Sequence, residues 1–226
     1  MTSISSFADM RRPGSRIPKL LAISSPRATP GTDWSRWCAA LAMSGVDALQ
    51  VRSKDLPDAQ RLSLLTQARE HLGPSQLLFL SSRIDLALSG GADGVQLPAS
   101  GLPVAALRSV VGKRLTIGRS THSVDEVRTA RDEGADFALF GPVFETPSKS
   151  GILEPRGLDR LLAAVAIGLP IVAIGGIDGA MAAQAFAAGV AGVAAIRWFE
   201  NPQRIRHEIA LYSPLPPDAA AQEDGH

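Results

Sequence analysis

The stretch Gly134-Ala135-Asp136, followed by FALFG at residues 137–141, carries the pattern that decides the fold of this chain. Three related copies stand elsewhere: Gly45-Val46-Asp47 before ALQVR, Gly91-Ala92-Asp93 before GVQLP, and Gly189-Val190-Ala191 before GVAAI. Their first glycines lie at 45, 91, 134 and 189, so the spacings are 46, 43 and 55 residues. A period of this length accommodates two β/α units, which makes the four apolar runs every second strand of a repeat.

Each copy has a local physical meaning, because glycine ends a helix in the left-handed conformation and lets the chain turn directly into a buried strand. The remaining strands are expected midway between the copies, at Leu20–Ser24, Leu77–Leu80, Leu115–Ser120 and Ile171–Ile174. Helical patterns fill the gaps, most clearly at Asp58–His71, Ser123–Glu133, Leu158–Ile167 and Pro202–Leu211. Eight strands that alternate with helices predict an α/β protein with a single (β/α)8 TIM barrel. A doubly wound open sheet is the structural alternative.

Length and composition agree with one domain. The chain has 226 residues, near the lower end of the range for a closed β/α barrel. Apolar residues make up 45% and aromatic residues only 5%, so small aliphatic side chains must build most of the interior. We expect a loose N-terminal arm at 1–17, the barrel at 18–212, and a disordered tail at 213–226 that is rich in proline, alanine and acidic residues.

Charge and cysteine usage exclude several classes of partner. With 23 basic and 22 acidic residues the net charge is +1, so no overall field recruits nucleic acid. The single cysteine, Cys38, excludes an intrachain disulfide and a cysteine metal cluster, and its helical surroundings favour a buried structural thiol over a reactive one. No window approaches 18 uninterrupted apolar residues and no secretory signal is present, so a membrane is not expected and a cytoplasmic location is the default expectation.

Polar residues that follow the strands are the candidate site, because a β/α barrel binds its ligand at the C-terminal ends of its strands. The second strand ends in QVRSK, and alternation along the strand turns Gln50, Arg52 and then Lys54 towards the barrel mouth. Two cations and an amide on one face suit an anion such as diphosphate. An outward solvent-facing surface is the alternative interpretation.

The fifth strand ends in GRSTHS, which places Arg119, Ser120 and His122 beside the start of a helix. Ser123 before Val-Asp-Glu is a capping-box pattern that marks this helix start. His122 is a candidate general base, since imidazoles ordinarily titrate near neutral pH. A supporting role, in which His122 only hydrogen bonds to other site residues, is equally compatible with the pattern.

The sixth and seventh strands lead into two further candidate segments. A long loop after the sixth strand carries Thr146, Ser148 and Lys149 and resembles a lid that brings an ammonium onto a phosphate, although a plain surface loop has the same composition. Gly175 and Gly176 follow the seventh strand, where paired glycines expose backbone amides to an anion at close range. Loops after strands seven and eight are the recurring phosphate site of this fold.

These motifs together resemble the thiamine phosphate synthase/TenI family of β/α barrels over about Pro18 to Leu211. The pieces that carry the resemblance are QVRSK, RIDLALSGGADGVQLP, GRSTHS, GPVFETPSK and AIGGI, in that order. Membership implies thiamine metabolism, in which the synthases join a pyrimidine methyl diphosphate to a thiazole phosphate and release diphosphate. The resemblance implies pyrimidine-diphosphate contacts at Gln50, Arg52, Lys54, Ser120 and Lys149, and thiazole-phosphate contacts at Thr146, Ser148, Gly175 and Gly176.

Departures from the family pattern bear on the activity. The synthases hold Mg2+ with an Asn-Asp pair after the third strand and an aspartate after the fourth, whereas this sequence has Ser81-Ser82 and, by register, Gly101. Hydroxyls replace carboxylates poorly around a hard divalent ion. VQLP, GRSTHS and FGPVFET are closer to the TenI branch, whose characterised members act as thiazole tautomerases. That branch uses a histidine where this chain has Pro142, and Arg197 stands where the family usually has serine.

The sequence therefore supports three hypotheses. The first is a TenI-like protein that binds thiazole phosphate or thiamine phosphate, with thiazole tautomerase (isomerase) activity if His122 serves as the acid/base group. The second is a thiamine phosphate synthase, a transferase, which alone would call for Mg2+; no cofactor and no metal site are otherwise expected. The third is a non-catalytic binder of a thiamine-related phosphate. The expected partner is a small phosphorylated thiazole or pyrimidine, and the sequence allows a homo-oligomer without specifying one.

Overall fold

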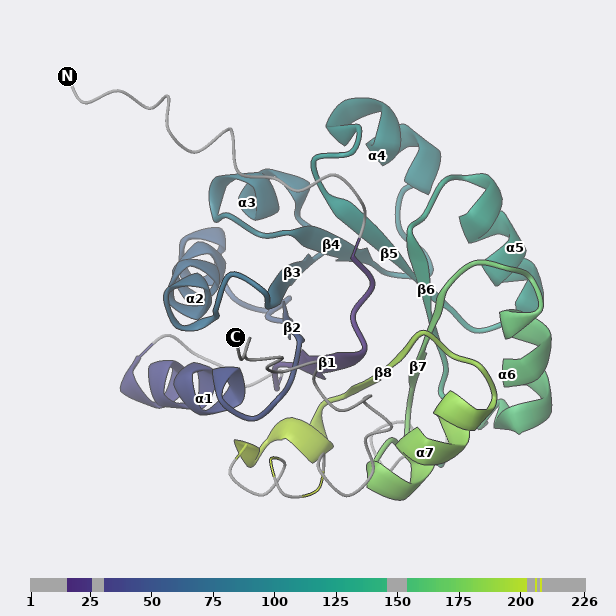
Figure 1. Cartoon of the computed structure of the whole chain (residues 1–226). Helices are drawn as coiled ribbons and strands as arrows, with labels where there is room; N and C mark the ends of the chain where they lie inside the picture. Colours follow the sequence, from purple (N-terminus) through teal and green to yellow (C-terminus); the bar gives the residue numbers. More distant parts are fainter. Residues whose placement is uncertain (1–15, 26–30, 146–153, 203–205, 207, 209–226) are drawn as a thin grey trace, which may run out of the picture.

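The computed structural model describes residues 16–25, 31–145, 154–202, 206 and 208. Eight strands alternate with seven helices and a final 3-10 turn (Figure 1). The strands are β1 Leu20–Ile23, β2 Ala48–Val51, β3 Leu77–Ser81, β4 Gly94–Leu97, β5 Thr116–Thr121, β6 Phe137–Phe140, β7 Ile171–Ile174 and β8 Gly192–Ala195. The helices are α1 Thr32–Ala42, α2 Asp58–His71, α3 Ile84–Ser89, α4 Val104–Val111, α5 Val124–Asp132, α6 Gly157–Val165, α7 Gly179–Ala187 and the 3-10 turn η3 Arg197–Phe199.

The strands form one closed parallel barrel in sequence order, because β8 pairs with β1. Leu21 lies opposite Ala48 on one side and opposite Ala194 on the other, which closes the ring. The helices surround the barrel on the outside (Figure 1). The predicted (β/α)8 barrel is therefore confirmed and the open sheet is wrong. The predicted arm and tail, and most of the predicted helix at 202–211, lie outside the described residues.

The repeated glycines have the backbone conformation that the sequence predicted. Gly45, Gly91, Gly134 and Gly189 have φ values of 94°, 72°, 86° and 88°, in the left-handed region that favours glycine. Gly134, for example, follows α5 closely and precedes the first residue of β6 by three positions. The same turn between helix and strand is thus used at every second unit of the barrel.

The aspartate of the repeat ties each even strand to the odd strand before it. The carboxylates accept hydrogen bonds from main-chain amides near the starts of those odd strands: Asp47 from Leu20 (2.6 Å), Asp93 from Leu78 (2.8 Å) and Asp136 from Ile117 (2.6 Å). Arg69 pairs with Asp93 and Arg108 pairs with Asp136, which compensates the partly buried charges. In the fourth copy Ala191 replaces the aspartate, and its own amide donates to Ile171 at 2.8 Å.

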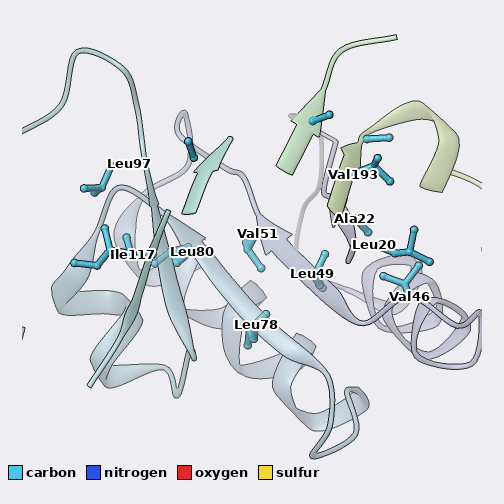
Figure 2. Close-up of a cluster of buried hydrophobic side chains, with 14 of the residues drawn as sticks. Leu20, Ala22, Val46, Leu49, Val51, Leu78, Leu80, Leu97, Ile117 and Val193 are labelled. Atoms are coloured by element: carbon cyan, nitrogen blue, oxygen red, sulfur yellow. The ribbon is translucent and has the colours of Figure 1, made fainter. Parts of the chain in front are cut away.

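Two hydrophobic layers stabilise the barrel. The larger lies between strands and helices, where alternate residues such as Leu49, Val51, Leu78 and Leu80 face outward (Figure 2). Cys38 on α1 belongs to this layer, and burial raises the pKa of its thiol to about 12, as expected for a structural cysteine. Among the described residues no helix is long and apolar enough to cross a membrane.

The smaller layer fills the barrel itself. Phe79 and Phe137 meet there edge to face, with ring centroids 5.7 Å apart. Both rings need a glycine on the facing strand: a Cβ on Gly94 would lie 2.3 Å from Phe79 Cε1, and a Cβ on Gly118 would lie 2.3 Å from Phe137 Cζ. Phe79 and Phe137 therefore occupy part of the barrel interior, beside branched aliphatic residues such as Leu21, Ile23 and Val172.

Gly94→Ala should destabilise the protein by about 1–3 kcal/mol, because the added methyl group would meet the Phe79 ring and the main-chain oxygen of Thr116 in a packed interior. Thermal and urea denaturation measure the change. Gly73→Ala is the matched control, since its Cβ meets only Gln76 Oε1, at 3.7 Å, and the unfolded chain loses entropy. Equal stability of the two variants would contradict the packing argument.

Candidate functional site

A cavity of about 950 Å³ opens at the C-terminal ends of the strands, above the two phenylalanines. All eight strands or the loops that follow them contribute to its wall. Its polar and charged lining residues are Ser25, Gln50, Arg52, Lys54, Ser81, Ser82, Gln96, Ser120, His122, Glu145, Asp178, Arg197, Trp198 and Glu200. The site thus occupies the face on which β/α barrels bind their ligands.

Gln50, Arg52 and Lys54 all line this cavity, as alternation along β2 predicted. Gln50 is only 3% exposed, and its Nε2 donates to Ser81 Oγ at 2.8 Å. Its Oε1 has no hydrogen-bond partner among the described protein atoms. A buried acceptor without a partner carries an energetic cost, so this atom is suited to receive a donor from a bound ligand.

Ser120 and His122 line the opposite part of the wall, at the end of β5. The predicted capping box starts α5: Ser123 Oγ accepts from the amide of Glu126 at 3.2 Å. Glu126 reaches back one residue further than the usual motif and accepts from the His122 amide at 2.6 Å. The helix start therefore fixes the backbone of His122 at the cavity wall.

The ring of His122 is held as well. Its Nδ1 lies 2.5 Å from the main-chain oxygen of Gly141, which only accepts hydrogen bonds, so Nδ1 carries the proton. In the neutral imidazole, Nε2 then has the lone pair. Because His122 lines the cavity, this arrangement offers one proton acceptor to a bound molecule.

Gly175 and Gly176 form part of the wall after β7 and have positive φ angles of 100° and 68°. A Cβ on Gly175 would lie 2.5 Å from Pro142 Cα, and one on Gly176 would lie 2.4 Å from the main-chain oxygen of Glu145. The segment after β6 packs on this turn, with the Phe144 amide donating to the Gly175 oxygen at 3.0 Å. Glycine is therefore required here for the close approach of two loops, in addition to any contact with an anion.

Four of the predicted contact residues are not placed at the cavity. Thr146, Ser148 and Lys149 lie outside the described residues. Arg119 does not line the cavity; its guanidinium donates to the main-chain oxygens of Ala99 and Leu102, each at 2.8 Å. It turns outward because its neighbour Ser120 turns inward on the same strand.

Sequence reasoning missed Gln96, which is 4% exposed and donates to Ser120 Oγ at 3.1 Å. The repeat contained the necessary pattern. The third residue after the aspartate lines the cavity in every copy, and the same holds for the copy that has Ala191 in place of the aspartate. These residues are Gln50, Gln96, Leu139 and Ala194. Five positions after the aspartate or Ala191 stand Arg52, Pro98, Gly141 and Ile196, which line the cavity too. Alignment of the copies would have identified Gln96 as the counterpart of Gln50.

The residues present do not fit the Mg2+ site that the sequence resemblance implies. Ser81 and Ser82 line the cavity where carboxylate ligands would be needed, and Gly101 has no side chain to contribute. Ser82 has a φ of 69°, in the left-handed region. Within the described ranges no three His, Cys, Asp or Glu residues gather in a way that could hold a metal ion.

Comparison with known proteins agrees with this geometry. Residues 20–199 match the family model described as thiamine monophosphate synthase. A Geobacter sulfurreducens protein provisionally named a thiamine-phosphate synthase is 42% identical over 177 residues, which are 76% of this chain and 83% of that protein. The thiamine-phosphate synthase of Methanoculleus marisnigri is 41% identical over 167 residues, covering 73% and 78%. The solved thiamine phosphate pyrophosphorylase of Pyrococcus furiosus has a TM-score of 0.70 at 30% identity, covering 86% and 94%.

Arg119 and Arg52 are expected to have different roles, although both stand near the C-terminal ends of strands, Arg119 within β5 and Arg52 just after β2. Arg119→Ala should lower the free energy of unfolding by about 1–3 kcal/mol through its lost hydrogen bonds, and should leave affinity for inorganic diphosphate within about threefold. Arg52→Ala should weaken that affinity about tenfold or more with little change in Tm. Thermal denaturation and calorimetric titration measure the two quantities, and the reverse outcome would show that the sequence-based role of Arg119 is right.

Proposed function

The chain belongs to the thiamine monophosphate synthase family, and we propose that it serves thiamine biosynthesis as a thiamine-phosphate synthase. In this transferase reaction a hydroxymethylpyrimidine diphosphate and a thiazole phosphate become thiamine phosphate and diphosphate. The observation that carries the proposal is the arrangement of one cavity. Gln50, Arg52, Ser120, Gly175 and Gly176 come from three separate strands and line the same 950 Å³ space.

The chemistry requires charge to be stabilised at the leaving group. The bond between the pyrimidine methylene carbon and the diphosphate oxygen breaks, and both electrons go to that oxygen. The thiazole nitrogen then supplies the electron pair for the new bond to carbon. Arg52 and Lys54 are suited to the developing diphosphate charge, because neither forms an ion pair with another described residue.

The neutral residues are suited to orienting the two rings. Gln50 and Gln96 each donate from Nε2 to a serine and keep Oε1 without a protein partner, which leaves acceptors for amino groups of a ligand. The glycine turn after β7 lines the cavity shortly before the start of α7, where main-chain amides are suited to a phosphate. The two substrates would thus lie on opposite sides of the barrel mouth.

Turnover tests this proposal directly. The full chain, given both substrates with Mg2+ present so that cation supply cannot limit the reaction, should form thiamine phosphate and diphosphate in equal amounts. Arg52→Ala should lower kcat/KM by about 10²–10³-fold, as for loss of one donor to a developing anion. Arg36→Ala on α1, an exposed arginine that does not line the cavity, should have no effect. Absence of product, or an equal loss in both variants, would contradict the proposal.

A second candidate is thiazole tautomerase activity, which the orientation of His122 favours. Tautomerisation moves a proton between atoms of one substrate and needs a single acid/base group. His122 presents Nε2 to the cavity while Gly141 holds Nδ1, whereas the neighbouring Pro142 has no titratable group.

Proton exchange tests the tautomerase candidate. In deuterated water, a thiazole carboxylate phosphate should exchange its ring proton in the presence of the protein, followed by NMR. His122→Ala should slow the exchange by about 10²–10⁴-fold, the usual contribution of a general base. His71→Ala at the end of α2, which does not line the cavity, is the matched control. Exchange that survives His122→Ala would exclude this residue as the base.

A further inference from the structure

The segments at the ends of β3 and β4 lack the carboxylates that would bind a metal, but they form hydrogen bonds with other parts of the protein. These contacts bear on how the chain neutralises the charge of a bound phosphate. We propose that the chain binds the phosphate groups of its ligand without a divalent cation and that Arg52, Lys54 and Arg197 neutralise them. The inference rests on the proposed function, because it concerns the same cavity and the same diphosphate.

The oxygen atoms of Ser81, at the end of β3, are already engaged by nitrogen donors. Ser81 Oγ accepts from Gln50 Nε2 at 2.8 Å. The main-chain oxygen of Ser81 accepts from Arg61 Nη2 at 2.8 Å and from the Arg83 amide at 2.9 Å, which uses both of its lone pairs. Arg61 is 6% exposed, so its positive charge lies fixed beneath this turn. A divalent cation at Ser81 would have to displace these donors and would be repelled by the guanidinium.

Asp58 and Asp85, at the starts of α2 and α3, are held by arginines. Arg61 Nη1 lies 3.5 Å from Asp58 Oδ1, and Arg83 binds both carboxylates. Arg83 binds Asp85 through Nε at 2.8 Å and Nη2 at 2.6 Å, and binds Asp58 through Nη1 at 2.5 Å. The hydrogen bonds from Arg83 lower the pKa of Asp85 to about 2. Neither Asp58 nor Asp85 lines the cavity. These carboxylates therefore serve to order the starts of α2 and α3.

The loop after β4 shows the same substitution. Gly101 stands at the position of the second carboxylate, and its main-chain oxygen accepts from Arg119 at 3.3 Å, beside the two stronger bonds from this guanidinium to Ala99 and Leu102. The Arg119 guanidinium, on the outside of the barrel, thus donates hydrogen bonds to three main-chain oxygens of this loop. At both places where a metal would be held, a guanidinium group binds main-chain oxygens: Arg61 binds that of Ser81, and Arg119 binds that of Gly101.

Cationic side chains instead gather on the adjoining part of the mouth, after β8 and β2. Arg197 belongs to η3 after β8, and Arg52 and Lys54 follow β2, so the three flank β1 in the ring order β8-β1-β2 (Figure 1). All three line the cavity. None of them forms an ion pair within the described part of the chain.

The cavity also has carboxylates, and their placement matters for the charge. Glu145, Asp178 and Glu200 line it, equal in number to the three cations. Asp178 caps α7 by accepting from the Met181 amide at 2.9 Å. Because none of the described cations is paired with any of the three, Arg52, Lys54 and Arg197 keep their hydrogen-bond donors for a phosphate. Arg197 adds to this set a planar donor group that can bind phosphate through two parallel hydrogen bonds.

Calorimetric titration of the full chain with inorganic diphosphate tests the inference. Titrations are made in EDTA and in excess Mg2+, with the free anion concentration corrected for its complex with Mg2+. The dissociation constants should agree within about twofold. Arg197→Ser should weaken binding about 10–100-fold in both buffers, since a hydrogen bond to a charged group contributes that much. Arg160→Ser on α6, which removes an exposed arginine away from the cavity, should leave binding unchanged.

The outcomes separate this inference from the proposed function. Affinity that rises tenfold or more with Mg2+ would overturn the inference and leave the synthase proposal standing. Equal weakening by Arg197→Ser and Arg160→Ser would show that overall charge, and not Arg197 at the cavity, is responsible, which also overturns it. No binding in either buffer would contradict both the inference and the proposed function. Tryptophan fluorescence gives a second readout, because Trp198 lines the cavity next to Arg197.

Discussion

The edge-to-face contact between Phe79 and Phe137 inside the barrel is the interaction on which the rest of the structure depends. Two rings from β3 and β6 fill the interior because Gly94 and Gly118 leave room for them. Apolar packing closes the barrel at this level. The polar residues nearer the C-terminal ends of the strands therefore form the floor of the cavity. Gln50 and Gln96 stand at that level, buried and hydrogen bonded to serines on neighbouring strands. The packed interior thus sets the depth at which a ligand can bind.

The repeat connects this interior to both ends of the barrel. At the N-terminal end, its aspartates accept hydrogen bonds from the amides of the preceding strands and hold arginines, as Asp136 holds Arg108. At the C-terminal end, the residues three and five positions later line the cavity, as Gln50 and Arg52 do. The glycine turn sets the residue at which each strand begins, and side chains then alternate along the strand. The same turn therefore places both the stabilising aspartates at the N-terminal end and the cavity residues at the C-terminal end.

Arginine has two distinct roles in this barrel. Arg61, Arg83 and Arg119 bind main-chain oxygens or carboxylates and order the loops after β3 and β4. Arg52 and Arg197 line the cavity and have no such partners among the described residues. The chain belongs to the thiamine monophosphate synthase family, and this distribution of arginines is the observation behind the proposal that Arg52 and Arg197 bind phosphate.

The sequence by itself determined the barrel, its strands and part of the cavity wall. Glycine conformation, two-residue alternation and the capping box at Ser123 are local properties, so the positions of Gln50, Arg52, Ser120 and His122 followed from nearby residues. Only the tertiary structure decided the role of Arg119, because residues 17 to 20 positions away, on the loop after β4, supply its hydrogen-bond acceptors. It also decided the tautomer of His122, which the distant oxygen of Gly141 fixes. Contacts between separate strands depend on how the ring closes, and no local pattern in the chain contains that information.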